Sequence, residues 1–123
     1  MDGELKKRTQ TTGEELANTI SHALGALLAL AGAAPLLARG VMTGSAKTVF
    51  SLGAYALSLV LLYTASAVYH AARRPEVKRV LRIMDHCSIF VLILGTYIPM
   101  SLLVVGGRTG WMLFLTNTTL AVI

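Results

Sequence analysis

The chain has 123 residues, of which 54% are hydrophobic and only 14% carry a formal charge, and its mean hydropathy is +0.65. Because about 25% of the residues of an ordinary soluble domain are charged, this composition is too poor in charge to cover a surface in water. The net charge of +5 does not indicate a nucleic-acid partner, since the basic residues lie in short segments between apolar runs and lack an aromatic stacking platform. The composition therefore predicts a protein that lies in lipid.

Three long apolar runs follow one another along the chain. The first extends from Leu16 to Ala38 after a polar tail, residues 1–15, the second from Thr48 to Ala72, and the third from about Ile83 to Val105. A hydrocarbon core about 30 Å thick is crossed by a helix of roughly 20 mostly apolar residues. Each run therefore predicts a membrane-spanning helix, and the predicted fold class is an all-α, multi-pass transmembrane helix bundle.

A fourth apolar run begins at Trp111, after a predicted turn at Gly106–Gly110, and continues to Ile123. It has no cap, basic flank or polar tail at its end, and from Thr109 it would rise only about 22 Å, which is less than the hydrocarbon thickness. The sequence thus predicts one membrane domain, residues 16–123, that contains three and a half to four helices and is truncated at its C-terminus.

Basic residues are distributed unequally between the two ends of the predicted helices. Eight lie at one end: Lys6, Lys7, Arg8, Arg73, Arg74, Lys78, Arg79 and Arg82. Only Arg39, Lys47 and Arg108 lie at the other. Because cytoplasmic loops near span ends carry an excess of Lys and Arg, the N-terminal tail and the connection between the second and third helices are predicted to be cytoplasmic. Pro75 is expected to interrupt the helix within this connection.

Polar residues gather at the same predicted ends. Glu15, Asn18 and His22 open the first helix, His70 closes the second, and Asp85 opens the third. The spacing i, i+3, i+7 places the first three on one face of a helix. Since acidic and histidine side chains within spans are costly and usually face the bundle interior, this group is the candidate functional site.

Each member of this group has a structural interpretation beside a functional one. His70 could be an interfacial histidine or a metal ligand that binds through a neutral ring nitrogen. Asp85 needs a cation, a metal-bound water or a donor nearby, and Arg82, one turn earlier, could supply a simple ion pair. His86 points some 100° away from Asp85 and is predicted to be an interface residue rather than a residue of the site. Cys87 is predicted to serve packing, with a metal-ligand role beside the site as the alternative.

Hydroxyl residues mark one face of the second predicted helix: Ser51, Tyr55, Ser58 and Ser66, in line with His70. This face is predicted to look into the bundle, where it could make contacts between helices or line a solute path. The sequence contains none of the motifs GxSxG, CxxC and HExxH, and no phosphate-binding glycine loop.

The polar residues fall into blocks that resemble the hemolysin III group of the progestin and adipoQ receptor superfamily, which is also similar to the alkaline ceramidases. Glu15–His22 matches its E-x-x-N-x-x-x-H block, Ser66–His70 its S-x-x-x-H block, and Asp85 with His86 its D-H block. The segment Gly95–Pro99 resembles the G-T-Y-x-P that follows. The resemblance covers nearly the whole chain, with the blocks in the expected order.

This resemblance implies seven transmembrane helices, a cytoplasmic N-terminus and a zinc ion held by the histidine of S-x-x-x-H and by two histidines of a later H-x-x-x-H. His70 would be a zinc ligand, Asp85 would act catalytically by holding the zinc-bound water, and Ser66 would be its polar partner. The other three residues would orient these groups or pack helices: Glu15, Asn18 and His22. The sequence contains no H-x-x-x-H, so two of the three implied ligands are absent from it.

Three functions are compatible with this sequence. The first is a zinc-dependent hydrolase of a lipid amide or ester, for which this stretch alone would be inactive. The second is cytolysis through a pore, although the outer halves of the first and third predicted helices are mostly apolar. The third is a membrane receptor or regulator without catalysis. The expected location is the cell membrane, as in a bacterial inner membrane, with membrane lipid as partner and possible substrate and the oligomeric state left open.

Overall fold

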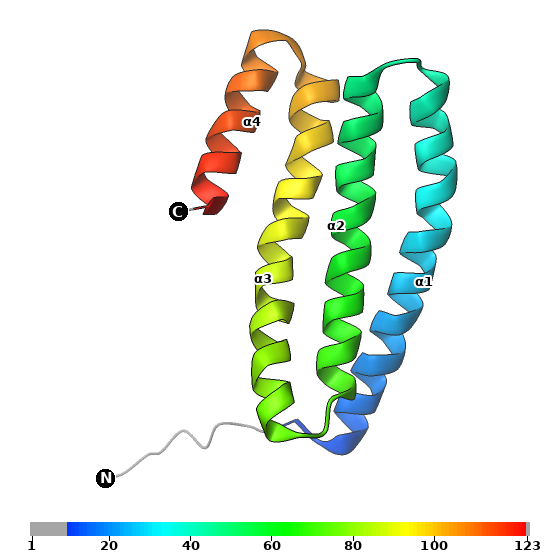
Figure 1. Ribbon diagram of the computed structural model, residues 1–123, viewed down its shortest axis with the longest axis vertical. Helices are drawn as coiled ribbons and strands as arrows, with labels where there is room; N and C mark the ends of the chain where they lie inside the picture. Colours follow the sequence, from blue (N-terminus) through cyan, green and yellow to red (C-terminus); the bar gives the residue numbers. More distant parts are fainter. Residues whose placement is uncertain (1–9, 123) are drawn as a thin grey trace.

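The computed structural model describes residues 10–122, which form four α-helices and one short π-helix (Figure 1). Their bounds are α1 Thr12–Met42, α2 Ala46–Ala71, α3 Pro75–Pro99, η1 Met100–Val105 and α4 Gly107–Val122. Within this described range, three segments are long and apolar enough to cross a membrane: α1, α2, and α3 together with η1. The prediction of an all-α, multi-pass membrane bundle is therefore confirmed.

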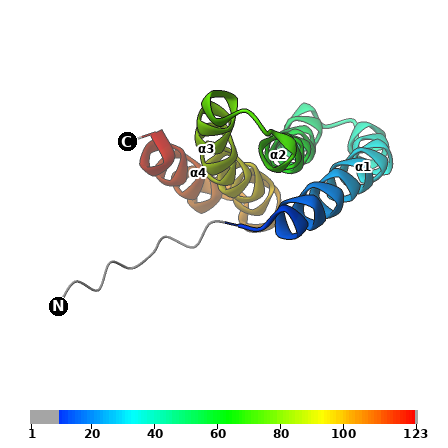
Figure 2. The same ribbon diagram turned by 90° about the horizontal axis from the view of Figure 1, so that it is seen from below.

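The helices lie side by side in chain order and alternate in direction. α1 packs on α2, α2 on α3, and α4 on α3 and η1. Seen from below, they form a single curved layer, and α2 has a neighbour on each side (Figure 2). Because successive helices are antiparallel, the start of α1, the end of α2 and the start of α3 meet at one end of the molecule (Figure 1).

Small side chains fill the spaces between the helices, and large apolar side chains point outward. Among the described residues the buried hydrophobic ones are Ala29, Ala56, Ile98 and Leu102, and the buried polar ones are Ser51, Ser58, Ser66, Ser88 and Ser101. Leu28, by contrast, is 72% exposed. Such an arrangement is typical of membrane helices, which associate through small residues while the large apolar residues contact lipid.

α2 and α3 approach each other most closely at Gly95. A Cβ atom added there would overlap with the Ser58 side chain and would lie 3.2 Å from the Ala54 carbonyl oxygen. Ser58 donates its hydroxyl hydrogen to the Tyr55 carbonyl of its own helix, over 2.8 Å. Gly95 has no side chain, and the Ser58 hydroxyl already has its hydrogen-bond partner within α2, so the two helices can approach closely here. This contact fixes the register of α2 against α3.

α1 begins four residues earlier than the apolar run predicts. Thr11 and Glu14 form a reciprocal capping box, in which the Glu14 amide donates to Thr11 Oγ1 over 3.2 Å and the Thr11 amide donates to Glu14 Oε2 over 2.8 Å. This pair satisfies amides that a helix start leaves without partners. The predicted tail 1–15 is therefore helical from Thr12, and residues 1–9 lie outside the described part of the chain.

α3 begins at Pro75, whereas its predicted start was about Ile83. The proline lies at the first helical position, where its fixed φ suits the helix and its missing N–H costs no hydrogen bond. The predicted basic connection is correspondingly short, since Lys78, Arg79 and Arg82 lie in the first turns of α3. Pro75 does interrupt the helix between α2 and α3, as predicted.

At the opposite end, α3 continues into the π-helix η1, and the chain then reverses at Gly106. The Gly106 amide donates to the Ser101 carbonyl over 2.9 Å, and the φ angles of Gly106 and Gly107 are +63° and +54°. Positive φ suits glycine, which has no Cβ to clash. The turn predicted at Gly106–Gly110 is narrower than expected, because α4 already begins at Gly107.

Candidate functional site

The predicted polar residues come together where α1 begins, α2 ends and α3 begins. Glu15 lies in the first turns of α1, opposite His70 in the last turn of α2. His22, two turns further along α1, lies opposite Ser66, one turn earlier on α2. The antiparallel pairing of the two helices therefore makes two polar contacts at successive depths.

Glu15 connects the three helices through its two carboxylate oxygens. Its Oε2 lies 2.7 Å from His70 Nδ1 on α2, and its Oε1 lies 2.7 Å from Lys78 Nζ on α3. The side chains of His70, Glu15 and Lys78 are 9%, 20% and 27% exposed. A carboxylate only accepts hydrogen bonds, so Nδ1 of His70 carries the hydrogen of this contact.

Lys78 is the residue of this cluster that the sequence did not predict as part of the site. Its ammonium group also donates to the Ala72 carbonyl over 3.4 Å and lies 5.0 Å from the centroid of the Tyr69 ring. A cation over an aromatic ring is stabilised by the ring's quadrupole. The signal for Lys78 in the sequence is Glu15 itself, because a carboxylate at a span entrance requires a cation.

The second contact lies deeper in the bundle. His22 Nδ1 and the buried Ser66 Oγ are 2.6 Å apart. The His22 ring makes edge contacts with Tyr63, at a centroid distance of 6.0 Å, and with His70, at 5.6 Å. The two polar pairs are thus joined through ring contacts. The prediction that Glu15, Asn18 and His22 face the neighbouring helices is confirmed for Glu15 and His22.

Asn18 lies between Glu15 and His22 in the sequence, and it is half-buried. Its side chain has no hydrogen bond to another helix within the described residues. Its backbone carbonyl accepts the Ser21 hydroxyl over 3.1 Å. The structure therefore places Asn18 at the margin of the cluster.

Asp85 lies on α3 with a side chain that is 17% exposed. The register set by Lys78 beside Tyr69 and by Gly95 against Ser58 places it at about the depth of Ser66. Its carboxylate forms no ion pair with Arg82, so the simple pairing considered from the sequence does not form. Its closest basic atom in the described structure is His86 Nδ1, at 3.9 Å.

Two predicted interior residues of α3 lie on the outer surface. The His86 side chain is 67% exposed and its Nδ1 donates to the Arg82 carbonyl over 2.7 Å, so it does not lie at an interface between the described helices, contrary to the prediction. Cys87 is also exposed, contrary to its predicted packing role. Both residues lie on the side of α3 that turns away from α2, about 100° or more around the helix from Asp85.

The donor set of this end fits one imidazole ligand of a metal ion. His70 uses Nδ1 for Glu15, which leaves Nε2 with its lone pair in the neutral ring, and a carboxylate on the other ring nitrogen is the usual support of a metal-binding histidine. Over residues 10–122, no group of three or more His, Cys, Asp or Glu side chains is placed to hold a metal ion.

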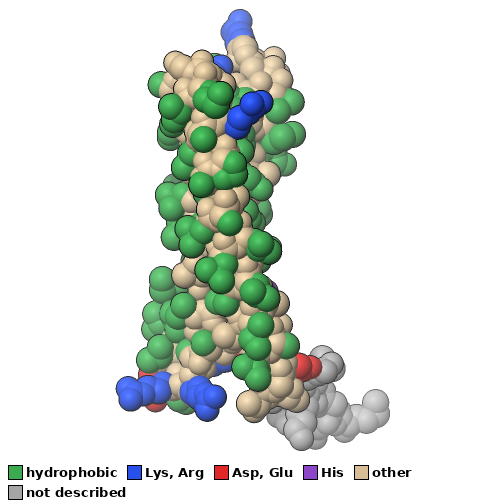
Figure 3. Space-filling view, turned by 90° about the vertical axis from the view of Figure 1, so that its right-hand side faces the viewer, with side chains coloured by type: hydrophobic (Ala, Val, Ile, Leu, Met, Phe, Trp, Pro, Cys, Tyr) green, Lys and Arg blue, Asp and Glu red, His purple; other side chains and the backbone are tan. Residues whose placement is uncertain are grey.

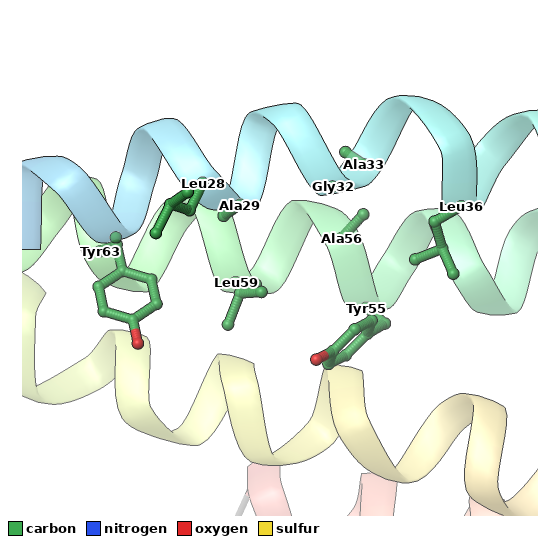
Figure 4. A pocket seen from close by; sticks show the side chains of 10 residues that line it. Leu28, Ala29, Gly32, Ala33, Leu36, Tyr55, Ala56, Leu59 and Tyr63 are labelled. Atoms are coloured by element: carbon green, nitrogen blue, oxygen red, sulfur yellow. The ribbon is translucent and has the colours of Figure 1, made fainter.

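An apolar groove of about 580 Å³ runs along α1 and α2 from this site (Figure 4). Its walls carry small or apolar side chains and two tyrosines: Gly25, Leu28, Ala29, Gly32, Ala33, Leu36, Tyr55, Ala56, Leu59 and Tyr63. Tyr63 lies at the end nearest the polar cluster, where it contacts His22. The groove and the cluster therefore adjoin. The volume of the groove lies within the range of small-molecule sites.

Comparison of the sequence with known proteins identifies its family. The family model of haemolysin-III related proteins matches residues 10–123. The chain belongs to the haemolysin-III related family. It is 35% identical to Hemolysin-3 of Bacillus cereus over 122 residues, which are 99% of this chain and 56% of that protein. It is 36% identical to a Hemolysin-3 homolog of Bacillus subtilis strain 168 over 111 residues, 90% of this chain and 52% of that protein.

The chain thus spans about half the length of these haemolysin-III relatives. No solved structure matches it. The resemblance inferred from the polar blocks is confirmed at the level of the family, and the family match covers all of the residues that form the polar cluster.

Proposed function

We propose that the chain is part of a zinc-dependent hydrolase that cleaves an amide or ester bond of a membrane lipid, with His70 as one zinc ligand. The observation that carries this proposal is the contact of His70 Nδ1 with Glu15, which turns Nε2 into the available ligand atom. The other ligands would come from residues outside this cluster. When bound, zinc would polarise the carbonyl group under attack.

The residues around His70 would fix its orientation. Glu15 accepts the Nδ1 hydrogen and is itself held by Lys78, so the imidazole ring is constrained from two helices. The Tyr69 ring packs against it at a centroid distance of 4.7 Å. A ligand that is held in place before binding loses less conformational entropy when the metal arrives.

Asp85 and Ser66 would act on the reacting groups. At its depth near Ser66, the Asp85 carboxylate would orient the attacking water and accept its proton. The Ser66 hydroxyl, held by His22 at 2.6 Å, would hydrogen-bond the lipid headgroup beside the scissile bond. Asn18 and His22 would support these groups from α1.

The apolar groove supports a lipid as the substrate class. It joins the polar cluster at Tyr63 and extends along α1 and α2 through the apolar part of the bundle, so an acyl chain in the groove would present its polar linkage to the cluster (Figure 4). Gly32 is part of the groove wall and has no atom within 4 Å of the position of a Cβ. A larger side chain there would therefore enter the open space of the groove.

The test is a hydrolysis screen of lipid amides and esters with the protein expressed from its complete reading frame. His70→Ala should lower the rate by at least about a hundredfold, since one ligand is lost, whereas His86→Ala should leave it unchanged. Gly32→Leu should slow long-chain substrates more than short-chain ones. Equal rates for the unsubstituted protein and His70→Ala would contradict the proposal.

Cytolysis is the second candidate, and it is favoured by the name of the relatives, hemolysin. Against a polar path, the buried serines of α2 donate to carbonyls of their own helix: Ser51 to Lys47 and Ser58 to Tyr55, each over 2.8 Å. Release of a trapped dye from liposomes, measured beside the hydrolysis screen, separates the two. Dye release without hydrolysis would favour cytolysis.

A further inference from the structure

A second pocket lies beside the polar cluster, on the outer side of α3. It has a volume of about 280 Å³ and is formed by the end of α2 and the first two turns of α3: Tyr69, Pro75, Lys78, Arg79 and Arg82. Three of these five residues are basic and none is acidic. Arg79 and Arg82 are exposed, and their spacing of three residues places them on one face of the helix.

The charges of this pocket are only partly compensated. Lys78 is paired with Glu15 at 2.7 Å. Neither Arg79 nor Arg82 forms an ion pair with any residue of the described range 10–122. The pocket therefore presents two guanidinium groups, whose planar donors suit a phosphate better than a lysine ammonium does. Tyr69 adds an aromatic wall, and its ring already contacts Lys78.

The depth of the pocket indicates which phosphate would reach it. The segment Pro75–Val105 has 31 residues, and at about 1.5 Å per residue it is roughly 16 Å longer than a hydrocarbon core about 30 Å thick. Its first turns, which carry Arg79 and Arg82, therefore lie at the level of the lipid headgroups. Figure 3 shows Lys and Arg side chains at both ends of the molecule, this one included, and hydrophobic side chains along the surface between the two ends.

We propose that the pocket formed by Tyr69, Pro75, Lys78, Arg79 and Arg82 binds the phosphate of an anionic phospholipid headgroup. Arg79 and Arg82 supply the charge-assisted hydrogen bonds, and the apolar surface of α3 contacts the acyl chains. A basic pocket at the headgroup level beside a transmembrane helix is a recognised type of anionic lipid site. The pocket adjoins the proposed hydrolytic site and shares Tyr69 and Lys78 with it. Arg79 and Arg82, which would bind the phosphate, take no part in the Glu15 cluster.

Native mass spectrometry of the full chain in detergent tests this proposal, with phosphatidylglycerol and phosphatidylcholine as probes. The double variant Arg79→Gln, Arg82→Gln should lose at least about tenfold in affinity for phosphatidylglycerol. The matched control Arg73→Gln, Arg74→Gln removes the same charge from the same end of the bundle, but these residues lie in the connection before α3 and outside the pocket. It should change the affinity less than about twofold. Phosphatidylcholine should bind weakly to all three proteins.

Two outcomes of the binding measurement would overturn the proposal. An equal loss in both double variants would indicate general attraction by the basic residues at this end of the bundle. Displacement of the lipid by inorganic phosphate at matched ionic strength would indicate a site for free phosphate. A measurement without substitutions adds a third arm: phosphatidylglycerol with a photoreactive headgroup should label the unsubstituted chain within residues 69–82. Labelling confined to residues 43–47 or 106–110, at the other end, would contradict the assignment.

Discussion

Glu15 is the residue on which the polar cluster depends most, because each of its two oxygens is bound from a different helix. One oxygen accepts from His70 on α2 and the other pairs with Lys78 on α3, both over 2.7 Å. The side chain is 20% exposed, so water screens the ion pair only in part. Its removal would leave Lys78 without a counter-charge and His70 without its acceptor.

We expect Glu15→Gln to destabilise the bundle by about 1–3 kcal/mol, the usual cost of losing a hydrogen bond to a charged group. Thermal unfolding in detergent measures this effect. Glu76→Gln is the matched control, because Glu76 is exposed in the first turn of α3 and forms no ion pair among the described residues. Equal melting temperatures for the two variants would show that the Glu15 contacts contribute nothing.

The sequence predicted the inward face of α1 correctly from spacing alone, since Glu15 and His22 recur at a helical interval. It could not predict their partners, because the pairing depends on the offset between two antiparallel helices and this offset is set by packing at distant contacts. The offset brings Glu15 to His70 and His22 to Ser66. Lys78 was missed for the same reason: its side chain reaches across α2 to α1.

At the scale of the elements, α2 organises the bundle through a face of buried serines. Ser51, Ser58 and Ser66 are 0%, 2% and 4% exposed. Each is small enough to let a neighbouring helix approach, and their hydroxyls have partners. The sequence predicted that this face looks into the bundle, and this prediction is confirmed.

The close contact of α2 and α3 gives a second test. Gly95→Ala should lower stability by about 1–3 kcal/mol, because the new methyl group would overlap with Ser58 and overpacking forces the helices apart. Gly32→Ala, on the open face of α1, should be neutral or slightly stabilising, since alanine favours helix more than glycine does. If Gly95→Ala were tolerated as well as Gly32→Ala in thermal unfolding, the contact would not be as close as described.

The ends of the elements were less predictable than their apolar centres. Hydropathy identifies the part of a helix that lies in hydrocarbon, whereas α1 and α3 extend beyond it into turns that carry charges. The Thr11–Glu14 capping box and the favourable first-position proline, Pro75, were the signals for these starts. The π-helix η1 after Pro99 has no sequence signature of comparable strength.

At the scale of the whole molecule, the asymmetry of basic residues predicts its orientation in the membrane. The first turns of α3 and the connection before it carry five Lys and Arg residues, and the connection between α1 and α2 lies at the opposite end (Figure 1). The connection between α2 and α3, and the polar cluster with it, should therefore be cytoplasmic.

Cysteine labelling in intact cells tests this orientation, in a Cys87→Ser background that removes the native thiol. A membrane-impermeant reagent should modify a cysteine substituted at Ala46, which is exposed at the start of α2, and should not modify one at Glu76. Modification of Glu76→Cys, with Ala46→Cys protected, would show that the chain has the opposite orientation.

The central claim of the proposed function is that His70, oriented by Glu15, binds zinc. The most direct measurement is the zinc content per chain after gel filtration, determined by mass spectrometry on the protein expressed from its complete reading frame. We predict about one zinc per chain for the unsubstituted protein and for His86→Ala, and near-complete loss for His70→Ala, because one ligand of three is removed. Retention of the metal by His70→Ala at the level of His86→Ala would contradict the account.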